Sequence, residues 1–159
     1  MVDTTYPPAR VYERQDGAHV VPAGAAIIVE PGGAMIGTQM KKSARSVWFN
    51  LDNGAGVTVD DVIMRPATAI TIVAARIVYV DVTAGTVAAG SAAIGTTVAG
   101  VDIVAATAYA NGAAVGATTA MTVVNGAVPA GTPVIVRHTG VAATAVGQAF
   151  VEIDYTVDP

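Results

Sequence analysis

The sequence predicts an all-β protein: a jelly-roll-like or Greek-key β-sandwich with a small N-terminal β region and an extended N-terminal arm. Val, Thr, Ile and Gly are abundant, whereas leucine, a strong helix former, occurs once, as Leu51. Apolar and polar residues alternate with period two in several segments. From residue 85 on, turn signals built from Gly, Pro or Asn-Gly recur at short intervals between apolar segments, a pattern typical of sandwiches.

The first segment, residues 1–17 ("MVDTTYPPARVYERQDG"), predicts an arm. It combines two adjacent prolines, several charges and two spaced aromatic residues with no sustained periodicity. Such a segment buries too little apolar surface to order itself, so we expect it to be disordered or to lie on a partner.

The second segment, residues 18–65, predicts a small β-rich anchoring region. In "SVWFNLDNGAGVTV", alternation places Val47, Phe49 and Leu51 on one face. Trp48, Asn50 and Asp52 then belong to the opposite, polar face. Trp48 is therefore a candidate exposed contact residue, against the alternative that it packs beneath a loop.

The third segment, residues 66–159, predicts the β-sandwich domain. "AITIVAARIVYVDV" is the longest strand signal, and both of its faces are largely apolar, as in a central strand. One predicted face carries Ile70, Ile72, Ala74, Val78 and Val80, and Arg76 interrupts it. In the last strand, "FVEIDYTVDP", the residues predicted to point inward are Val151, Ile153, Tyr155 and Val157, and those predicted to point outward are Glu152, Asp154 and Thr156.

A four-residue motif shared by two segments predicts a turn rather than a binding or catalytic site. Val-Pro-Ala-Gly occurs at residues 21–24 and again at 128–131, each time before an aliphatic run. Pro and Gly suit the second and fourth positions of a turn. No helix and no Lys-Ser/Thr pair follow, so the glycines predict no phosphate site.

Composition narrows the function classes. The chain has no cysteine, so disulfides and thiolate metal sites are excluded. A formal net charge of −4 argues against nucleic-acid binding. The local basic cluster Lys41, Lys42 and Arg45 is interpreted as a solvated loop, with a contact to an acidic surface as the alternative.

The apolar character of the chain predicts contacts with other proteins rather than a membrane span. Residues are 53% hydrophobic and 13% charged, yet the longest uncharged stretch, 103–136, is interrupted by polar and turn residues. The N-terminal segment also lacks the apolar core of a signal peptide. Uncharged surfaces of this kind are often covered by copies of the same chain or by a larger assembly.

No constellation of residues predicts catalysis. His19 and His138 each sit beside one of the repeated motifs, but no metal-ligand spacing accompanies them. Asp60 and Asp61 are adjacent on a predicted strand and so point to opposite faces, which makes them a poor acid–base pair. We therefore expect no enzymatic activity, no cofactor and no bound metal.

Three segments together are typical of one class of protein: the arm "TTYPPARVYERQDG", the β start "VVPAGAAIIVEPGG", and "NGAAVGATTAMTVVNGAVPAGTPVIVRHTG". Through them the chain resembles small structural proteins of tailed-phage virions, especially head decoration (cement) proteins. The Gly-Ala-Ala-Val-Gly of the third segment is similar to a motif in lambda-like decoration proteins. The resemblance implies a virion protein on the capsid exterior that binds the major capsid protein, often as a homotrimer. The physical character of the arm nominates the capsid-contact candidates, which are Tyr6, Pro7, Pro8, Tyr12 and Arg14.

Two other functions remain open from the sequence. One is a head-fibre or tail-tip module that binds a receptor or glycan, which an exposed aromatic cleft would support. The other is a small β-fold hydrolase or metalloprotein.

Overall fold

The computed structural model describes residues 12–13, 19–20, 41–142 and 146–158, in two compact units, Met1–Thr38 and Gln39–Pro159. In the first unit, β1 (Tyr12–Glu13) pairs antiparallel with β2 (His19–Val20), with Tyr12 opposite Val20. The other arm candidates, Tyr6, Pro7, Pro8 and Arg14, lie outside the described residues.

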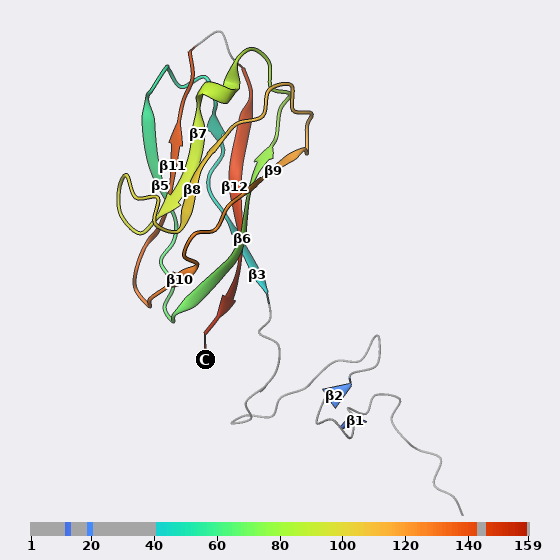
Figure 1. Cartoon of the computed structure of the whole chain (residues 1–159), viewed down its shortest axis with the longest axis vertical. Coiled ribbons are helices and arrows are strands. Elements are labelled where there is room, and N and C mark those ends of the chain that lie inside the picture. Colours follow the sequence, from blue (N-terminus) through green and yellow to red (C-terminus); the bar gives the residue numbers. More distant parts are fainter. Residues whose placement is uncertain (1–11, 14–18, 21–40, 143–145, 159) are drawn as a thin grey trace, which may run out of the picture. The chain divides into compact units, whose positions relative to one another are not determined.

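The second unit consists of two antiparallel sheets packed face to face (Figure 1). The "β6–β12 sheet" has at its centre β6 (Ile70–Tyr79) and β12 (Gln148–Val157), flanked by β3 (Lys42–Arg45) and β4 (Phe49–Asn50) on the β12 side and by β9 (Thr118–Met121) and β10 (Ala127–Val128) on the β6 side. The "β11 sheet" runs in the order β5 (Thr58–Met64), β11 (Val134–Thr139), β7 (Ser91–Gly95) and β8 (Val104–Ala108).

The predicted all-β sandwich is confirmed. In the part of the chain that the structure describes, the helical element is one 3₁₀ turn, Val87–Ala89, and no helix there is long and apolar enough to cross a membrane. A jelly-roll path of the strands stays a prediction.

The strand pairing does not follow the boundary predicted between residues 65 and 66. β3 and β4 pair with β12, and β5 pairs with β11, so residues 42–64 are part of the two sheets built by residues 70–157. Strands of two to seven residues cannot bury an apolar face alone, and pairing with β11 and β12 supplies the surface that they need. Residues 42–64 therefore belong to the sandwich.

An irregularity in β6 changes which of its residues face the core. Asp154 lies opposite Ala74 and Tyr155 opposite Ile72, so Val73 is an extra residue on β6. Ile72 points inward before it, but the residues buried after it are Ala75, Ile77 and Tyr79. The predicted apolar face with Ala74, Val78 and Val80 is therefore wrong beyond Ile72, and Arg76 belongs to the outer face.

The same irregularity affects the end of β12. Val151 and Ile153 are fully buried, as predicted. Beyond it, Thr156 is buried rather than outward-facing, and its hydroxyl lies 3.5 Å from the carbonyl oxygen of Thr71. Tyr155 and Val157 are only partly buried, although they still pack against the core.

A buried threonine ties together two loops at one end of the sandwich. The Thr83 side chain, which follows β6, donates a hydrogen bond from Oγ1 to the Ala110 carbonyl oxygen at 2.9 Å. The same oxygen accepts a bond from the Ala113 amide at 2.6 Å. The residue is 2% exposed, so its hydroxyl satisfies two backbone groups where little water reaches.

Candidate binding surface

The edge of the β6–β12 sheet is interrupted between β3 and β4. The Ser46 amide donates to the Val151 carbonyl at 2.9 Å, and the Val151 amide donates to Ser46 Oγ at 2.9 Å. Pairing resumes with Phe49 opposite Ala149, which leaves Val47 and Trp48 together opposite one residue, Phe150. Two residues against one is a β-bulge, here closed by a serine side chain.

This bulge projects two apolar side chains into solvent. Val47 is 63% exposed and Trp48 is 62% exposed. Because Phe49 is buried, its neighbour Trp48 lies on the outer face of the sheet. The predicted exposure of Trp48 is confirmed, whereas its role as a contact residue stays a prediction. Val47, predicted to share the inward face of Phe49, is exposed because of the bulge.

Polar and aromatic side chains share the outer face of the sheet with Trp48. The Arg45 guanidinium lies over the Phe150 ring, 5.8 Å from its centroid. One row further along, Gln148 Nε2 donates to Asn50 Oδ1 at 2.8 Å. We call this set the Trp48 surface, which consists of Arg45, Val47, Trp48, Asn50, Gln148 and Phe150.

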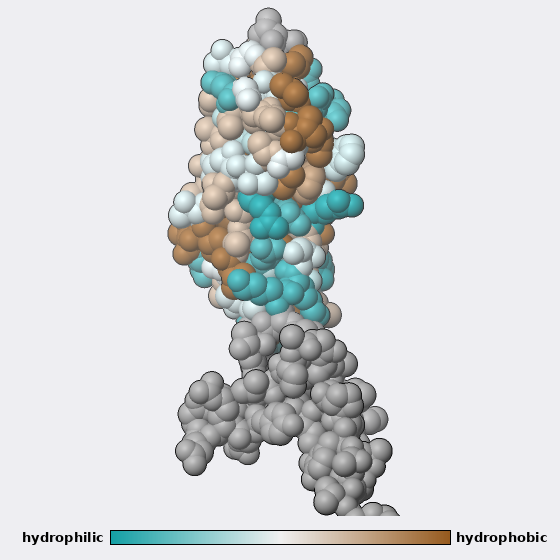
Figure 2. All heavy atoms as spheres, turned by 90° about the vertical axis from the view of Figure 1, so that its right-hand side faces the viewer, coloured by the Kyte–Doolittle hydropathy of each residue, from teal (hydrophilic) through white to brown (hydrophobic). Residues whose placement is uncertain are grey.

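The other half of the same face is charged. Arg76 contacts Glu152 at 2.8 Å and Asp154 at 3.0 Å, and Ser43 donates to Asp154 at 2.7 Å. The Ser43 hydrogen bond, together with Arg76, holds the pKa of Asp154 below its usual value. Figure 2 shows this side of the sandwich, where hydrophilic residues occupy the middle and lower part of the face, with one hydrophobic patch above them and another to their left.

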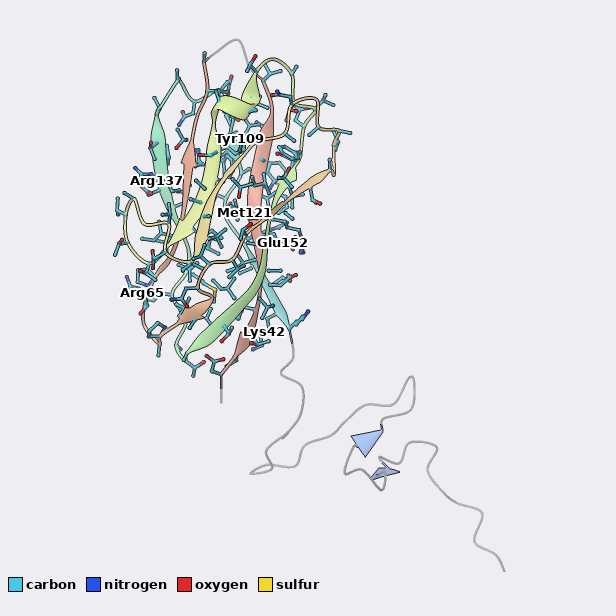
Figure 3. All side chains as sticks on the ribbon, viewed as in Figure 1. Lys42, Arg65, Tyr109, Met121, Arg137 and Glu152 are labelled. Carbon is cyan, nitrogen blue, oxygen red and sulfur yellow. The ribbon has the colours of Figure 1, made fainter. Side chains whose placement is uncertain are left out.

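Figure 3 distinguishes side chains in the core from side chains on the outer face. Tyr109 and Met121 lie between the sheets, whereas Glu152 projects from the outer side of the β6–β12 sheet. Burial raises the pKa of Tyr109, whose hydroxyl donates to the Ser91 carbonyl at 2.8 Å, so this phenol stays protonated.

The basic cluster is placed differently from its prediction. Lys42 and Arg45 lie on the edge strand β3 rather than in a loop, and both are exposed. Exposed cations along an edge strand discourage pairing with a foreign strand.

His138 is a core residue. Its side chain is 4% exposed and stacks on Phe49 at 4.3 Å between ring centroids. Nε2 lies 3.9 Å from Asp61, while Asp60 lies 3.9 Å from Arg137, so the two adjacent carboxylates serve different partners, in line with the prediction of opposite faces. Burial lowers the pKa of His138 despite the opposing effect of Asp61 and Asp60, so the ring is neutral at neutral pH.

The described residues offer no metal centre. No group of three or more His, Asp or Glu side chains among them is arranged to hold a metal ion. His19 belongs to the first unit and His138 to the second.

Sequence reasoning did not predict which residues of β12 lie beside the Trp48 strand. Alternation already placed Asn50 on the Trp48 face, but it gave Asn50 no partner. Gln148 is 98 residues away in sequence and reaches Asn50 only through the register of β12 with β4. Phe150 lies opposite Val47 and Trp48 only through that same register.

The second unit is thus an antiparallel β-sandwich with a divided outer face. No model of a protein family matches the chain, and no curated protein matches it by sequence. Among solved structures, this chain is similar to a chain of the cyanophage Pam1 capsid asymmetric unit, with a TM-score of 0.51 and 14% sequence identity. The match covers 86% of this chain and 97% of that chain, and at this identity it shows a shared fold.

Proposed function

We propose that this chain is a non-enzymatic virion protein that binds the outer surface of a phage capsid and stabilises it, as a decoration (cement) protein does. The observation that carries the proposal is the fold shared with a chain of a phage capsid asymmetric unit, over 86% of this chain and 97% of that one. The resemblance of the arm and of the Gly-Ala-Ala-Val-Gly segment to decoration proteins supports the same role.

The exposed apolar side chains of the sandwich support the proposal that this chain is part of a larger assembly. Many valines are more than half exposed, and they lie both on strands and in loops; those in loops include Val82, Val98, Val115 and Val124. Burying such side chains against other copies or against a shell is favourable by about 25 cal/mol per Å² before the costs of association. We propose a homo-oligomer, a trimer by analogy with decoration proteins, bound to the major capsid protein.

A structural role also fits the state of His138. This is the histidine of the sandwich unit, and it is buried, neutral and stacked on Phe49. A ring in this position does not reach a substrate. In our proposal the arm, with Tyr6, Pro7, Pro8, Tyr12 and Arg14, supplies the capsid contact, because it gains order by lying on a partner.

The test is a binding assay with phage heads assembled without this chain. Full-length protein should co-sediment with the heads and raise the temperature at which they rupture. A variant lacking residues 1–17 should stay folded and oligomeric but fail to bind. Binding of the truncated variant at full occupancy would refute the arm as anchor, and no binding by the full-length chain would refute the decoration role.

The oligomeric state has its own measurement. Light scattering after size-exclusion chromatography should give the mass of a trimer. A stable monomer at micromolar concentration would refute the oligomer while leaving the binding assay to decide the decoration role.

A further inference from the structure

The proposed anchor leaves the Trp48 surface without a role. The bulge at Ser46–Trp48 interrupts the backbone ladder of the edge, so an added strand cannot pair continuously along it. A ligand at this place is therefore recognised by side chains rather than by backbone pairing.

Trp48 offers a flat apolar platform. It is 62% exposed although it is the largest side chain type in proteins, and the Ser46 hydrogen bonds fix the backbone that carries it. An indole face attracts the weakly positive C–H groups of a ring stacked on it. The C–H face of a sugar ring has this chemistry.

The neighbouring amides offer a matched set of hydrogen-bonding groups. Gln148 uses one N–H to bind Asn50 Oδ1. Among the described residues, this bond leaves two donors on the Asn50 nitrogen and the acceptor Oε1 of Gln148 for a ligand. Two neighbouring hydroxyl groups, each both donor and acceptor, complement such a pair.

The spacing brings the platform and the amides to one ligand. Trp48 and Asn50 are two residues apart on the same face, which corresponds to about 7 Å along a strand. A ring stacked on the indole then presents its edge hydroxyls to the amide pair. The nearby carboxylates of Glu152 and Asp154 are held by Arg76 and Ser43, so they do not compete for these hydroxyls.

We propose that the Trp48 surface binds a neutral oligosaccharide, with Trp48 as the stacking platform and Asn50 and Gln148 as the hydrogen-bonding pair. This proposal does not depend on the decoration role. The site is open and small, so one copy binds at about millimolar affinity, and display of many copies on one particle raises the avidity.

The experiment uses the single tryptophan of the chain as its reporter. Full-length protein is applied to a printed array of neutral hexose and N-acetylhexosamine oligosaccharides, and the glycan with the strongest signal is titrated in solution. Trp48 emission should shift to the blue and become protected from acrylamide with saturation. Because stacking and amide contacts carry no net charge, the dissociation constant should change less than about twofold between low and high salt.

Three variants sharpen the test. Trp48→Ala should abolish array binding, and the double variant Asn50→Ala/Gln148→Ala should weaken binding about tenfold while keeping the reporter. The matched control is Val124→Ala, which truncates a side chain that is 65% exposed outside the Trp48 surface and should bind normally. Unchanged circular dichroism and thermal melts confirm that each variant is folded.

Two results would overturn the proposal. Absence of Trp48-dependent binding to any glycan on the array would do so. A blue shift that grows with protein concentration in the absence of sugar, and disappears on dilution, would show instead that a second copy covers Trp48. Head binding by Trp48→Ala is measured in parallel. If this variant still decorates heads at full occupancy, either of the two results above overturns the glycan site and leaves the proposed decoration role intact.

Discussion

Thr83 provides a sharp test of how the loops at one end of the sandwich are held. Its side-chain oxygen donates to the Ala110 carbonyl and accepts from the Ala113 amide, and the residue is 2% exposed. Thr83→Val keeps the shape of the side chain but removes both bonds. Thr83→Ser keeps the hydroxyl and loses only a methyl group.

The expected magnitudes differ between the two variants. Each lost hydrogen bond costs about 1 kcal/mol, and leaving a partly buried backbone group without a partner adds to that, so Thr83→Val should lower the free energy of unfolding by about 2–3 kcal/mol. Loss of one buried methyl in Thr83→Ser should cost about 1 kcal/mol.

Urea unfolding followed by far-UV circular dichroism measures the difference. With a slope of about 2 kcal/mol per M, the midpoint of Thr83→Val should fall by about 1–1.5 M and that of Thr83→Ser by about 0.5 M. Equal midpoints for the two variants would refute the reasoning, because the hydroxyl would then contribute nothing.

Two further predictions concern the backbone and the core. A Cβ at Gly126 would lie 2.1 Å from the Ile72 carbonyl oxygen, so Gly126→Ala should lower the melting temperature strongly. Gly131 has open space around it, and Gly131→Ala costs only the backbone strain of a residue at φ +75°. The melting temperature of Gly126→Ala should therefore lie well below that of Gly131→Ala. Calorimetry that ranks the two in the opposite order would contradict the packing of Gly126 on β6. Because burial lowers the pKa of His138, the unfolded chain binds the proton first as the pH falls below about 6.5, so stability should be full above that value and decline toward pH 5. Urea midpoints of His138→Phe, measured at pH 7 and pH 5, should lose most of this decline, and an unchanged decline would assign it to other groups.

The parts of the fold that depend on local pattern could be predicted from the sequence. The inward alternation of Phe49 and Leu51 and that of Val151 and Ile153 are both confirmed, because half-buried strands impose a period of two. The exposure of Trp48 follows from the same alternation. The scarcity of strong helix formers such as leucine likewise predicted strands rather than helices in the sandwich.

The parts that depend on strand register could not be predicted. Val73 becomes an extra residue only because β12 pairs with β6 on both sides of it, and this pairing reversed the faces assigned beyond Ile72. Val47 turns outward for the same kind of reason, since the Ser46 side chain takes the place of a backbone partner for Val151. Nothing in the local sequence of either segment indicates which strand it pairs with. The amide pair of Asn50 and Gln148 on the Trp48 surface therefore could not be predicted either.

The direction of strands β3 and β12 determines how the sandwich responds to mechanical load. Lys42 lies opposite Tyr155, so residue 41 and the end of β12 emerge at one end, whereas the 80–90 loop follows the end of β6 at the other. A force applied between residue 41 and Val157 would peel β3 from β12 one residue pair at a time. A force applied between residue 41 and the 80–90 loop would act along the strands and strain all of those pairs together. We therefore expect the sandwich to resist a force applied between residue 41 and the 80–90 loop. We expect it to open readily under a force applied between residue 41 and Val157, at the end of β12.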